Sequence, residues 1–232
     1  MYTVLKPIIA LLTMVFNGLH QFIVSIGVTN SGVSYVLAVL LVTVIVRLIL
    51  LPLNIKQMKS QTKMQELQPK MQQLQNKYKN DPQKQQMEIM KLYKEFGVSP
   101  FSGCLPLLIQ MPILFSLYYV FMGINIGGAS FLWLADLQQP DPYYILPILS
   151  TVTTFLSTYM MSKSTPSQNT GGMNMNSMNI VMSLMSGFIA LRIGSLLVLY
   201  WIMGNLIQII QNYFLIVLPA KKKKHEEARK NN

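Results

Sequence analysis

One arginine lies inside a membrane-length apolar segment of this sequence. Residues 33–53 read VSYVLAVLLVTVIVRLILLPL, and Arg47 is the only charged residue among them. An arginine at the centre of a membrane helix costs about 2.5–3.5 kcal/mol on insertion scales. Apolar neighbours cannot offset that cost, so the guanidinium needs water, a counter-charge or a bound partner. Two interpretations are open: the side chain snorkels to the cytoplasmic headgroups, or it belongs to a functional site within the membrane.

Polar side chains recur at helical spacing in the last apolar run and could serve as partners for Arg47. They follow one another at i, i+4, i+7 and i+11 and so share one helical face: Trp201, Asn205, Gln208 and Asn212. Three amides against lipid are unfavourable, so this face is expected to point inward. Similar candidates stand in the other apolar runs: Thr43, Gln110 and Ser157. Each alone is explained by ordinary hydrogen bonding between helices, but together they predict an amide-lined cavity that contains one cation.

The sequence offers no conventional catalytic or metal centre. None of the predicted spans holds an acidic residue, which argues against proton-coupled carriers and cation channels. There is no glycine-rich phosphate loop, no Ser/His/Asp arrangement and no carboxylate pair. Cys104 is the only cysteine, and neither His20 nor His225 has a Cys, Asp or Glu at metal-ligand spacing. Neither a metal nor a cofactor is therefore expected, and the chain is not expected to be an enzyme.

Composition places these residues in a polytopic helical membrane protein. Of the 232 residues, 51% are hydrophobic and 12% are charged, and the apolar residues come in membrane-length blocks. The expected fold is all-α, a five-span bundle with spans at 33–53, 101–123, 143–161, 178–191 and 195–218. The corresponding divisions are an N-terminal segment (1–32), span one (33–53), a cytoplasmic helical hairpin (54–100), spans two to five (101–218) and a basic tail (219–232).

The distribution of lysines sets the expected orientation. Segment 54–100 carries nine lysines, whereas the only charged residues in the loop between spans two and three are Asp136 and Asp141. The positive-inside rule therefore puts 54–100, the 162–176 loop and the C-terminus in the cytoplasm. The first span then runs from outside to inside.

The predicted hairpin has apolar seams and lysine-rich outer faces. Its first arm repeats apolar residues in three- and four-residue steps: Met64, Leu67, Met71, Leu74 and Tyr78. Asp81 before Pro82 predicts the N-cap of the second arm, and Pro69 predicts a kink or restart in the first. Lysines of the hairpin and tail are candidates for recruiting partners, or alternatively for solvation and contact with anionic lipid: Lys77, Lys79, Lys84, Lys91, Lys221, Lys222, Lys223 and Lys224.

Residues 7–28 form a further apolar run with polar residues on one face. These polar positions fall near i, i+4, i+7, i+8 and i+12: Thr13, Asn17, His20, Gln21 and Ser25. The pattern favours an amphipathic helix that lies at the membrane interface. A signal anchor that crosses the membrane is the alternative, because the run is also long enough to span.

Several of these stretches closely resemble the YidC/Oxa membrane protein insertases. The matching motifs are VIVRLILLPL at 44–53, KYKNDPQK and MKLYKEFGVSPFSGCLPLLIQMPILFSLY in the middle block, and LYWIMGNLIQIIQNY at 199–213. The resemblance covers the chain from residue 33 onwards. It implies a five-span core with a cytoplasmic hairpin and an amphipathic helix before the first span.

The resemblance also implies a function. Arg47 would sit in a hydrophilic groove that is open to the cytoplasm and to lipid but closed outside, lined by Thr43, Gln110 and Trp201. Ser157 stands where family members often carry a glutamine. The chain would insert nascent membrane proteins into the bacterial cell (plasma) membrane and help them fold, alone or with the Sec translocon. Its hairpin and tail would approach the ribosome or the signal recognition machinery.

Two other functions remain open from the residues alone. A small-solute transporter could use Arg47 as an anion site, and an assembly scaffold could bind membrane proteins without inserting them. Cross-linking of a nascent chain to the polar face would separate the three.

Overall fold

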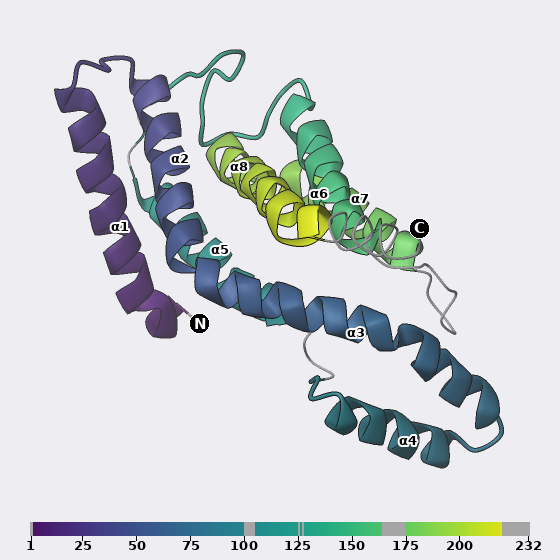
Figure 1. The fold of residues 1–232 in the computed structure, drawn as a ribbon. Helices are drawn as coiled ribbons and strands as arrows, with labels where there is room; N and C mark the ends of the chain where they lie inside the picture. Colours follow the sequence, from purple (N-terminus) through teal and green to yellow (C-terminus); the bar gives the residue numbers. More distant parts are fainter. Residues whose placement is uncertain (1, 100–104, 125, 127, 164–174, 220–232) are drawn as a thin grey trace, which may run out of the picture.

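The computed structural model describes residues 2–99, 105–124, 126, 128–163 and 175–219. Within them the fold is all-helical, apart from one isolated β-bridge between Phe131 and Leu134 (Figure 1). The helices are α1 (Tyr2–Ser25), α2 (Ser31–Ile49), α3 (Leu51–Lys77), α4 (Pro82–Glu95), α5 (Leu105–Gly123), α6 (Ile145–Lys163), α7 (Met175–Ala190) and α8 (Ser195–Asn212). α8 continues into a π-helical segment, η2 (Tyr213–Val217).

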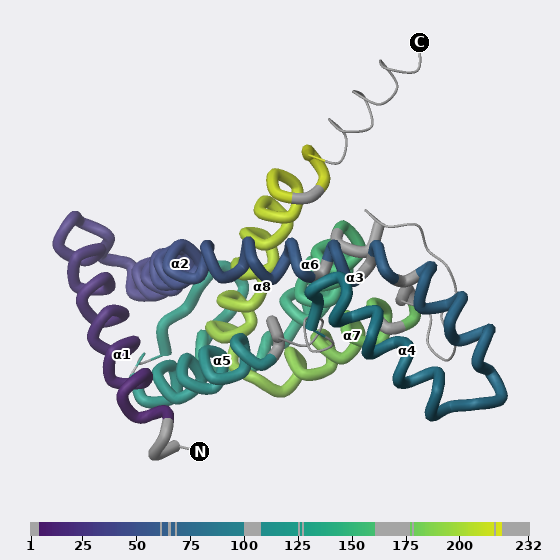
Figure 2. The backbone as a smooth tube through the Cα atoms, turned by 60° about the horizontal axis from the view of Figure 1, so that its bottom comes forward, coloured from purple at the N-terminus to yellow at the C-terminus, as the bar shows by residue number. Residues whose placement is uncertain are grey.

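The helices outside the hairpin pack in two groups that meet along α2 and α8. α1, α2 and α5 form one group, and α6 packs along both α7 and α8 to form the other (Figures 1 and 2). α2 contacts α8 directly, and α5 adds a smaller contact with α8. Fully buried apolar side chains from both groups fill the interior: Val39, Val42, Leu117, Leu196 and Val198. The contact between α2 and α8 is therefore the main connection between the two halves.

The predicted spans correspond to helices within a few residues, but the first apolar run is divided. α2 ends at Ile49 and α3 begins at Leu51, with Pro52 in the first turn of α3. Proline has no N–H to donate to the preceding turn, so the ladder of helical bonds is interrupted here. Among the described residues, three apolar helical stretches are long enough by length and hydropathy to cross a membrane: Leu5–Ser25, Ser31–Ile49 and Ser195–Leu215. The apolar stretches described in the other helices are shorter, so the five-span count stays a prediction: Leu108–Gly123, Ile145–Met160 and Asn179–Ala190.

The N-terminal helix packs along the bundle. α1 runs beside α2 in the opposite direction and also contacts α5 (Figure 1). Phe16 is fully buried, and the ring of His20 stacks on Tyr35 with their centroids 4.1 Å apart. His20 Nε2 also lies 3.0 Å from Ser34 Oγ, within hydrogen-bond distance. By length and hydropathy α1 can also cross a membrane, and its packing along α2 favours the alternative of a crossing helix. The choice between an interfacial helix and a crossing helix for residues 7–28 stays a prediction.

α3 and α4 form a helical hairpin that extends away from the bundle (Figures 1 and 2). Leu67, Leu92 and Tyr93 are buried between the two arms, where they pack with Met64, Met71, Leu74 and Ile89. The Tyr93 hydroxyl donates to Met71 Sδ at 3.4 Å, and burial raises the pKa of this hydroxyl. The apolar seam of the first arm thus faces the second arm.

Asp81 and Pro82 begin the second helix of the hairpin, and Pro69 lies inside the first. The Asp81 carboxylate accepts a 3.0 Å hydrogen bond from the Lys84 N–H, so Asp81 is the N-cap predicted before Pro82. α3 passes through Pro69 as a single helix, so no restart occurs there. The loss of one helical bond at that proline is tolerated within a helix that packs against its neighbour.

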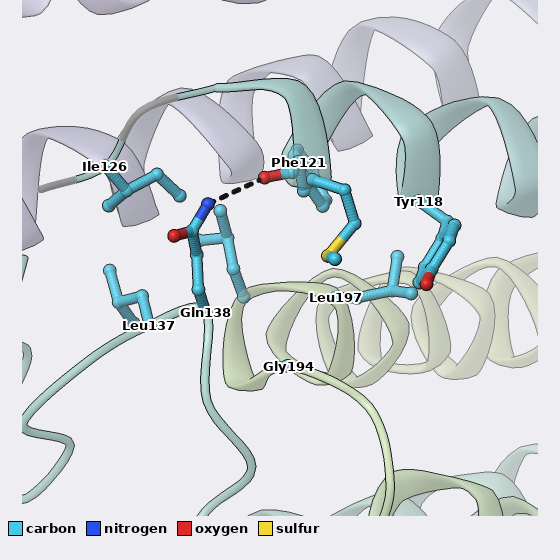
Figure 3. Close-up of a pocket in the computed structure, with 9 residues that line it drawn as sticks. Tyr118, Phe121, Ile126, Leu137, Gln138, Gly194 and Leu197 are labelled. Atoms are coloured by element: carbon cyan, nitrogen blue, oxygen red, sulfur yellow. Dashed lines mark hydrogen bonds between the residues drawn. The ribbon is translucent and has the colours of Figure 1, made fainter. Parts of the chain in front are cut away.

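The loop between α5 and α6 closes one end of the bundle. The Gln138 amide donates to the Phe121 carbonyl at 3.2 Å (Figure 3) and to the Ile124 carbonyl at 2.9 Å. The last carbonyls of a helix lack partners within the helix, so this amide caps the end of α5. The backbone of the same loop accepts 2.9 Å hydrogen bonds from the first N–H groups of α8, those of Ser195 and Leu196. The loop thus provides hydrogen-bond partners for backbone groups at the end of α5 and at the start of α8.

The pocket drawn in Figure 3 lies at this junction. Its volume is about 20 Å³, which is room for about one water molecule. A Cβ at Gly194 would lie 2.6 Å from the Gln138 carbonyl oxygen, so the close approach of the loop to α8 requires glycine. The loop and the start of α8 therefore pack closely at this junction.

The packing of α1 predicts a stability difference between two phenylalanines on that helix. Phe16 is 0% exposed and its ring meets Phe121 edge-on at 5.7 Å, whereas Phe22 is 59% exposed. We expect Phe16→Ala to lower the free energy of unfolding by about 3 kcal/mol, because it leaves a cavity. Phe22→Ala is the control and should change it by less than about 0.5 kcal/mol. Equal effects in detergent unfolding experiments would show that α1 does not pack this way.

Candidate functional site

Arg47 stands in the last turn of α2, and its side chain reaches across to α8. Nη1 donates to Gln208 Oε1 at 2.6 Å, and Nη2 donates to the Gly204 carbonyl at 3.0 Å. The two acceptors are four residues apart and therefore lie on one face of α8. The guanidinium is half-buried between the helices. Its hydrogen bonds to α8 favour the functional interpretation over snorkelling, and the depth of the charge in the membrane stays a prediction.

Both acceptors lie within the apolar part of α8, away from its ends. The apolar part of the last helix runs from Ser195 to Leu215. Gln208 comes thirteen residues after its start and seven before its end, about 20 Å and 10 Å at the helical rise of 1.5 Å per residue. Arg47 is close to the end of α2, but α8 holds its charge well inside an apolar helix.

A chain of hydrogen bonds continues from Arg47 through α8 to α6. Gln208 Nε2 donates to Asn212 Oδ1 at 2.9 Å, and Asn212 Nδ2 donates to the Ser157 carbonyl at 3.0 Å. Because a guanidinium only donates, Gln208 turns its oxygen to Arg47 and keeps its nitrogen for Asn212. The structure thus joins three predicted residues, Arg47, Gln208 and Asn212. Ser157 takes part through its backbone carbonyl, which its side chain could not have indicated.

Asn205 lies on a second polar contact, between α8 and α6. Its Nδ2 donates to the hydroxyl oxygens of Thr154 at 2.8 Å and Thr153 at 3.3 Å. Ser186 on α7 donates to Thr154 at 3.2 Å. Asn205 therefore ties α8 to α6 and α7, and it does not contact Arg47 by a hydrogen bond.

The other predicted groove residues lie apart from this set. Gln110 Nε2 donates to the Tyr200 hydroxyl at 3.1 Å, which links α5 to α8. Thr43 is 1% exposed, and its hydroxyl donates to the Val39 carbonyl of its own helix at 2.6 Å. Trp201 is half-buried on α8. Spacing correctly placed all three on the inner helices but did not show which of them meet Arg47.

Gly204 is a site residue that spacing of polar side chains could not single out. Its carbonyl accepts from Arg47, and a Cβ at this position would lie only 3.2 Å from Arg47 Nη2. The missing side chain therefore lets α2 and α8 approach closely. The available signal was its place four residues before Gln208, on the same helical face.

No carboxylate accompanies Arg47 in the part of the chain that the structure describes. The only ion pair there joins Lys91 to Glu88 at 2.6 Å, on α4. The same residues contain no group of three His, Cys, Asp or Glu side chains suited to a metal ion. A guanidinium has five N–H donors, and neutral oxygens leave its charge uncompensated. Such a group attracts carboxylates or other oxyanions, and it binds them more strongly than neutral acceptors.

The predicted recruitment lysines fall into two sets. Four are exposed on the hairpin: Lys77, Lys79, Lys84 and Lys91. Two of these cations lie over the ring of Tyr78, at 5.4 Å for Lys77 and 5.3 Å for Lys84. Lys91 donates to Glu88 and holds the pKa of that carboxyl below its usual range. The other four lie outside the described residues: Lys221, Lys222, Lys223 and Lys224.

Comparison with known proteins relates this arrangement to one family. The family model described as 60Kd inner membrane protein matches residues 27–223. The membrane protein insertase YidC of Clostridium perfringens is 58% identical over 231 residues, covering 98% of this chain and 97% of that protein. The insertase YidC of Clostridium tetani is 47% identical over 211 residues, covering 90% and 94%.

A solved structure is similar as well. It is described as an active YidC insertase crystal structure with the first transmembrane domain resolved. It is 33% identical to this chain with a TM-score of 0.66, and the match covers 87% of this chain and 46% of that one. The fold and the sequence thus point to the same relatives.

The hydrogen-bond chain predicts that Asn212 is structurally important. Asn212→Ala would leave Gln208 Nε2 and the Ser157 carbonyl without partners in a buried place, since Asn212 is 1% exposed. We expect the free energy of unfolding to fall by about 1–3 kcal/mol. Ile210→Ala is the control on the same helix, because that side chain is 57% exposed. A loss in the control as large as in Asn212→Ala, measured by unfolding in detergent, would contradict the assignment.

Proposed function

The chain belongs to the 60Kd inner membrane protein family and is a membrane protein insertase, and on that premise we propose that Arg47 is its contact for acidic segments of the substrate. The observation that supports this is a cation inside an apolar helix pair whose acceptors are all neutral. The substrates are membrane proteins, and the protein is integral to the bacterial cell membrane.

The proposed topology places the lysine-rich parts in the cytoplasm. The five-span core consists of α2 and α5 to α8, with the hairpin α3–α4 and the C-terminal tail inside. α1 is a further crossing helix, because it runs opposite to α2 and is long enough to span. Its N-terminus, near Lys6, then lies in the cytoplasm. The loop that contains Gln138 lies on the outer side and closes the bundle there.

In the proposed mechanism, α2 and α8 form the walls of a hydrophilic groove that opens to the cytoplasm and to lipid. The polar bonds between Arg47, Gln208 and Asn212 exchange with the polar tail of an entering substrate. The groove shortens the apolar distance that the tail must cross, and Arg47 attracts acidic residues in that tail. Burial of the substrate helix in lipid then drives the step, at about 0.8 kcal/mol per CH₂ group. The same groove would serve a chaperone role during folding, alone or beside the Sec translocon.

The hairpin is the proposed receptor for the machinery that delivers substrates. Its exposed lysines and those of the tail suit a polyanion such as ribosomal RNA, or the signal recognition machinery. The hairpin extends away from the bundle and carries exposed apolar side chains, Met87 at 59% and Met90 at 44%. These flexible thioethers suit varied nascent helices.

Removal of the Arg47 charge tests the proposed function. Arg47→Ala should reduce insertion of a single-span protein with an acidic N-terminal tail about tenfold, because a charge-assisted hydrogen bond contributes roughly 1.5–3 kcal/mol. Arg47→Lys should keep most of the activity if charge is what matters. The measurement is protease protection of the translated substrate in proteoliposomes. Arg192→Ala removes the same charge from the turn between α7 and α8 and is the matched control. Normal insertion by Arg47→Ala would contradict the role.

The hairpin proposal has a test of its own. Replacing Lys77, Lys79, Lys84 and Lys91 by Gln should weaken binding of translating ribosomes and lower the salt dependence of that binding. A matched control changes four other lysines of the same segment, so the net charge falls equally: Lys56, Lys59, Lys63 and Lys94. Co-sedimentation with proteoliposomes at several salt concentrations measures the difference. An equal loss in both variants would indicate a general charge effect, without a defined docking face.

A further inference from the structure

Gln208 occupies the place on Arg47 that suits a substrate carboxylate best. Its Oε1 lies 2.6 Å from Nη1, while the Gly204 carbonyl takes Nη2 at 3.0 Å. The Gly204 acceptor belongs to the helix backbone and cannot leave without distortion of α8. The Gln208 acceptor stands at the end of a side chain with three rotatable bonds. Of the two bonds that hold Arg47, only the one to Gln208 can open by rotation of a side chain.

The neutral amide of Gln208 matters for two reasons. It satisfies the guanidinium without neutralising it, so Arg47 keeps its attraction for an external carboxylate. It also has a donor to spare, which it uses on Asn212 Oδ1 at 2.9 Å. A carboxylate at this position could do neither, because an ionised acid accepts only and carries the opposite charge.

We propose that Gln208 is a specificity-determining residue: its side-chain oxygen holds the carboxylate position on Arg47 until the acidic residue of a substrate displaces it. This inference rests on the proposed function of Arg47 and adds which residue competes with the substrate for a guanidinium donor. Gln208 therefore sets how readily an acidic tail enters and how readily it leaves. A weak acceptor permits exchange, which an insertase needs because it must release every substrate into lipid.

Two substitutions of similar size should move the selectivity in opposite directions. Gln208→Glu places a tethered carboxylate beside Arg47, and a tethered group competes at a high effective concentration. Gln208→Leu removes the competing acceptor and leaves Arg47 Nη1 open to the substrate. Gln139→Glu is the matched control, because it makes the same change of side chain at an exposed position of the loop between α5 and α6.

The experiment compares one substrate in two forms. A single-span protein with an acidic N-terminal tail, and the same protein with the acids changed to Asn and Gln, are translated with proteoliposomes of each full-length variant. Protease protection measures insertion, and cross-linking of the tail at a fixed time measures retention. Thermal unfolding of each variant, measured in detergent, identifies any variant that is not folded.

Gln208→Glu should insert the acidic-tailed substrate about tenfold less well than the unchanged protein and as poorly as Arg47→Ala. It should leave the neutral-tailed substrate within about twofold. Gln208→Leu should raise the cross-linked fraction of the acidic tail only. Gln139→Glu should follow the unchanged protein.

The failure of this inference can be distinguished from that of the proposed function. If Arg47→Ala impairs acidic-tailed insertion while folded Gln208→Glu does not, the role of Gln208 is overturned and that of Arg47 stands. If Gln139→Glu has the same effect as Gln208→Glu, the added negative charge acts independently of its position beside Arg47, and the inference is likewise overturned. If neither Arg47→Ala nor Gln208→Glu changes insertion, the proposed function fails as well. If Gln208→Glu does not fold, Gln208→Leu decides alone: unchanged retention of the acidic tail overturns the inference.

Discussion

The rest of the structure depends on one electrostatic constraint: a guanidinium lies in the seam between two groups of apolar helices, and no carboxylate of the described residues is bonded to it. Among those residues its hydrogen-bond acceptors are two oxygen atoms of α8, one from the Gln208 side chain and one from the Gly204 backbone. An arginine can only donate, so each partner must present an acceptor. Gln208 and Asn212 therefore each turn the amide oxygen towards the preceding donor, and the chain of hydrogen bonds ends on the Ser157 carbonyl of α6. A Cβ at Gly204 would lie 3.2 Å from Arg47 Nη2, so glycine gives the guanidinium room to reach this carbonyl.

The two ends of the α2–α8 seam are held by different kinds of interaction. At one end, the loop that carries Gln138 hydrogen-bonds the end of α5 and the start of α8, and a Cβ at Gly194 would lie 2.6 Å from the Gln138 carbonyl oxygen. Near the other end, the side chains of Arg47, Gln208 and Asn212 hydrogen-bond one another and the backbone carbonyls of Gly204 and Ser157. Interhelical hydrogen bonds of this kind act together with van der Waals packing in the association of membrane helices. In the proposed topology the Gln138 end lies outside and the Arg47 end faces the cytoplasm, which suits the entry of polar segments from the cytoplasm.

The N-terminal helix shows how one pattern can serve two structures. Thr13, Asn17 and His20 lie on one face, which is typical of a helix at the membrane interface. In the folded chain His20 stacks on Tyr35 and meets Ser34, so part of this polar face is used against α2. Periodicity reports that a face is polar, and it cannot say whether headgroups or a neighbouring helix satisfies that face.

The sequence by itself determined the helical class, the approximate limits of the apolar helices and the set of polar residues that includes Arg47, Gln208 and Asn212. It could do so because membrane length, helical period and the Asp81–Pro82 cap are local properties of the chain. Only the tertiary structure decided that Gln208 holds Arg47 while Asn205 and Gln110 bond elsewhere, and that Thr43 bonds within its own helix. Those choices depend on the rotation and spacing of helices that are distant in sequence. The Gly204 and Ser157 contributions are backbone carbonyls, and every residue has one, so residue type carries no signal for them.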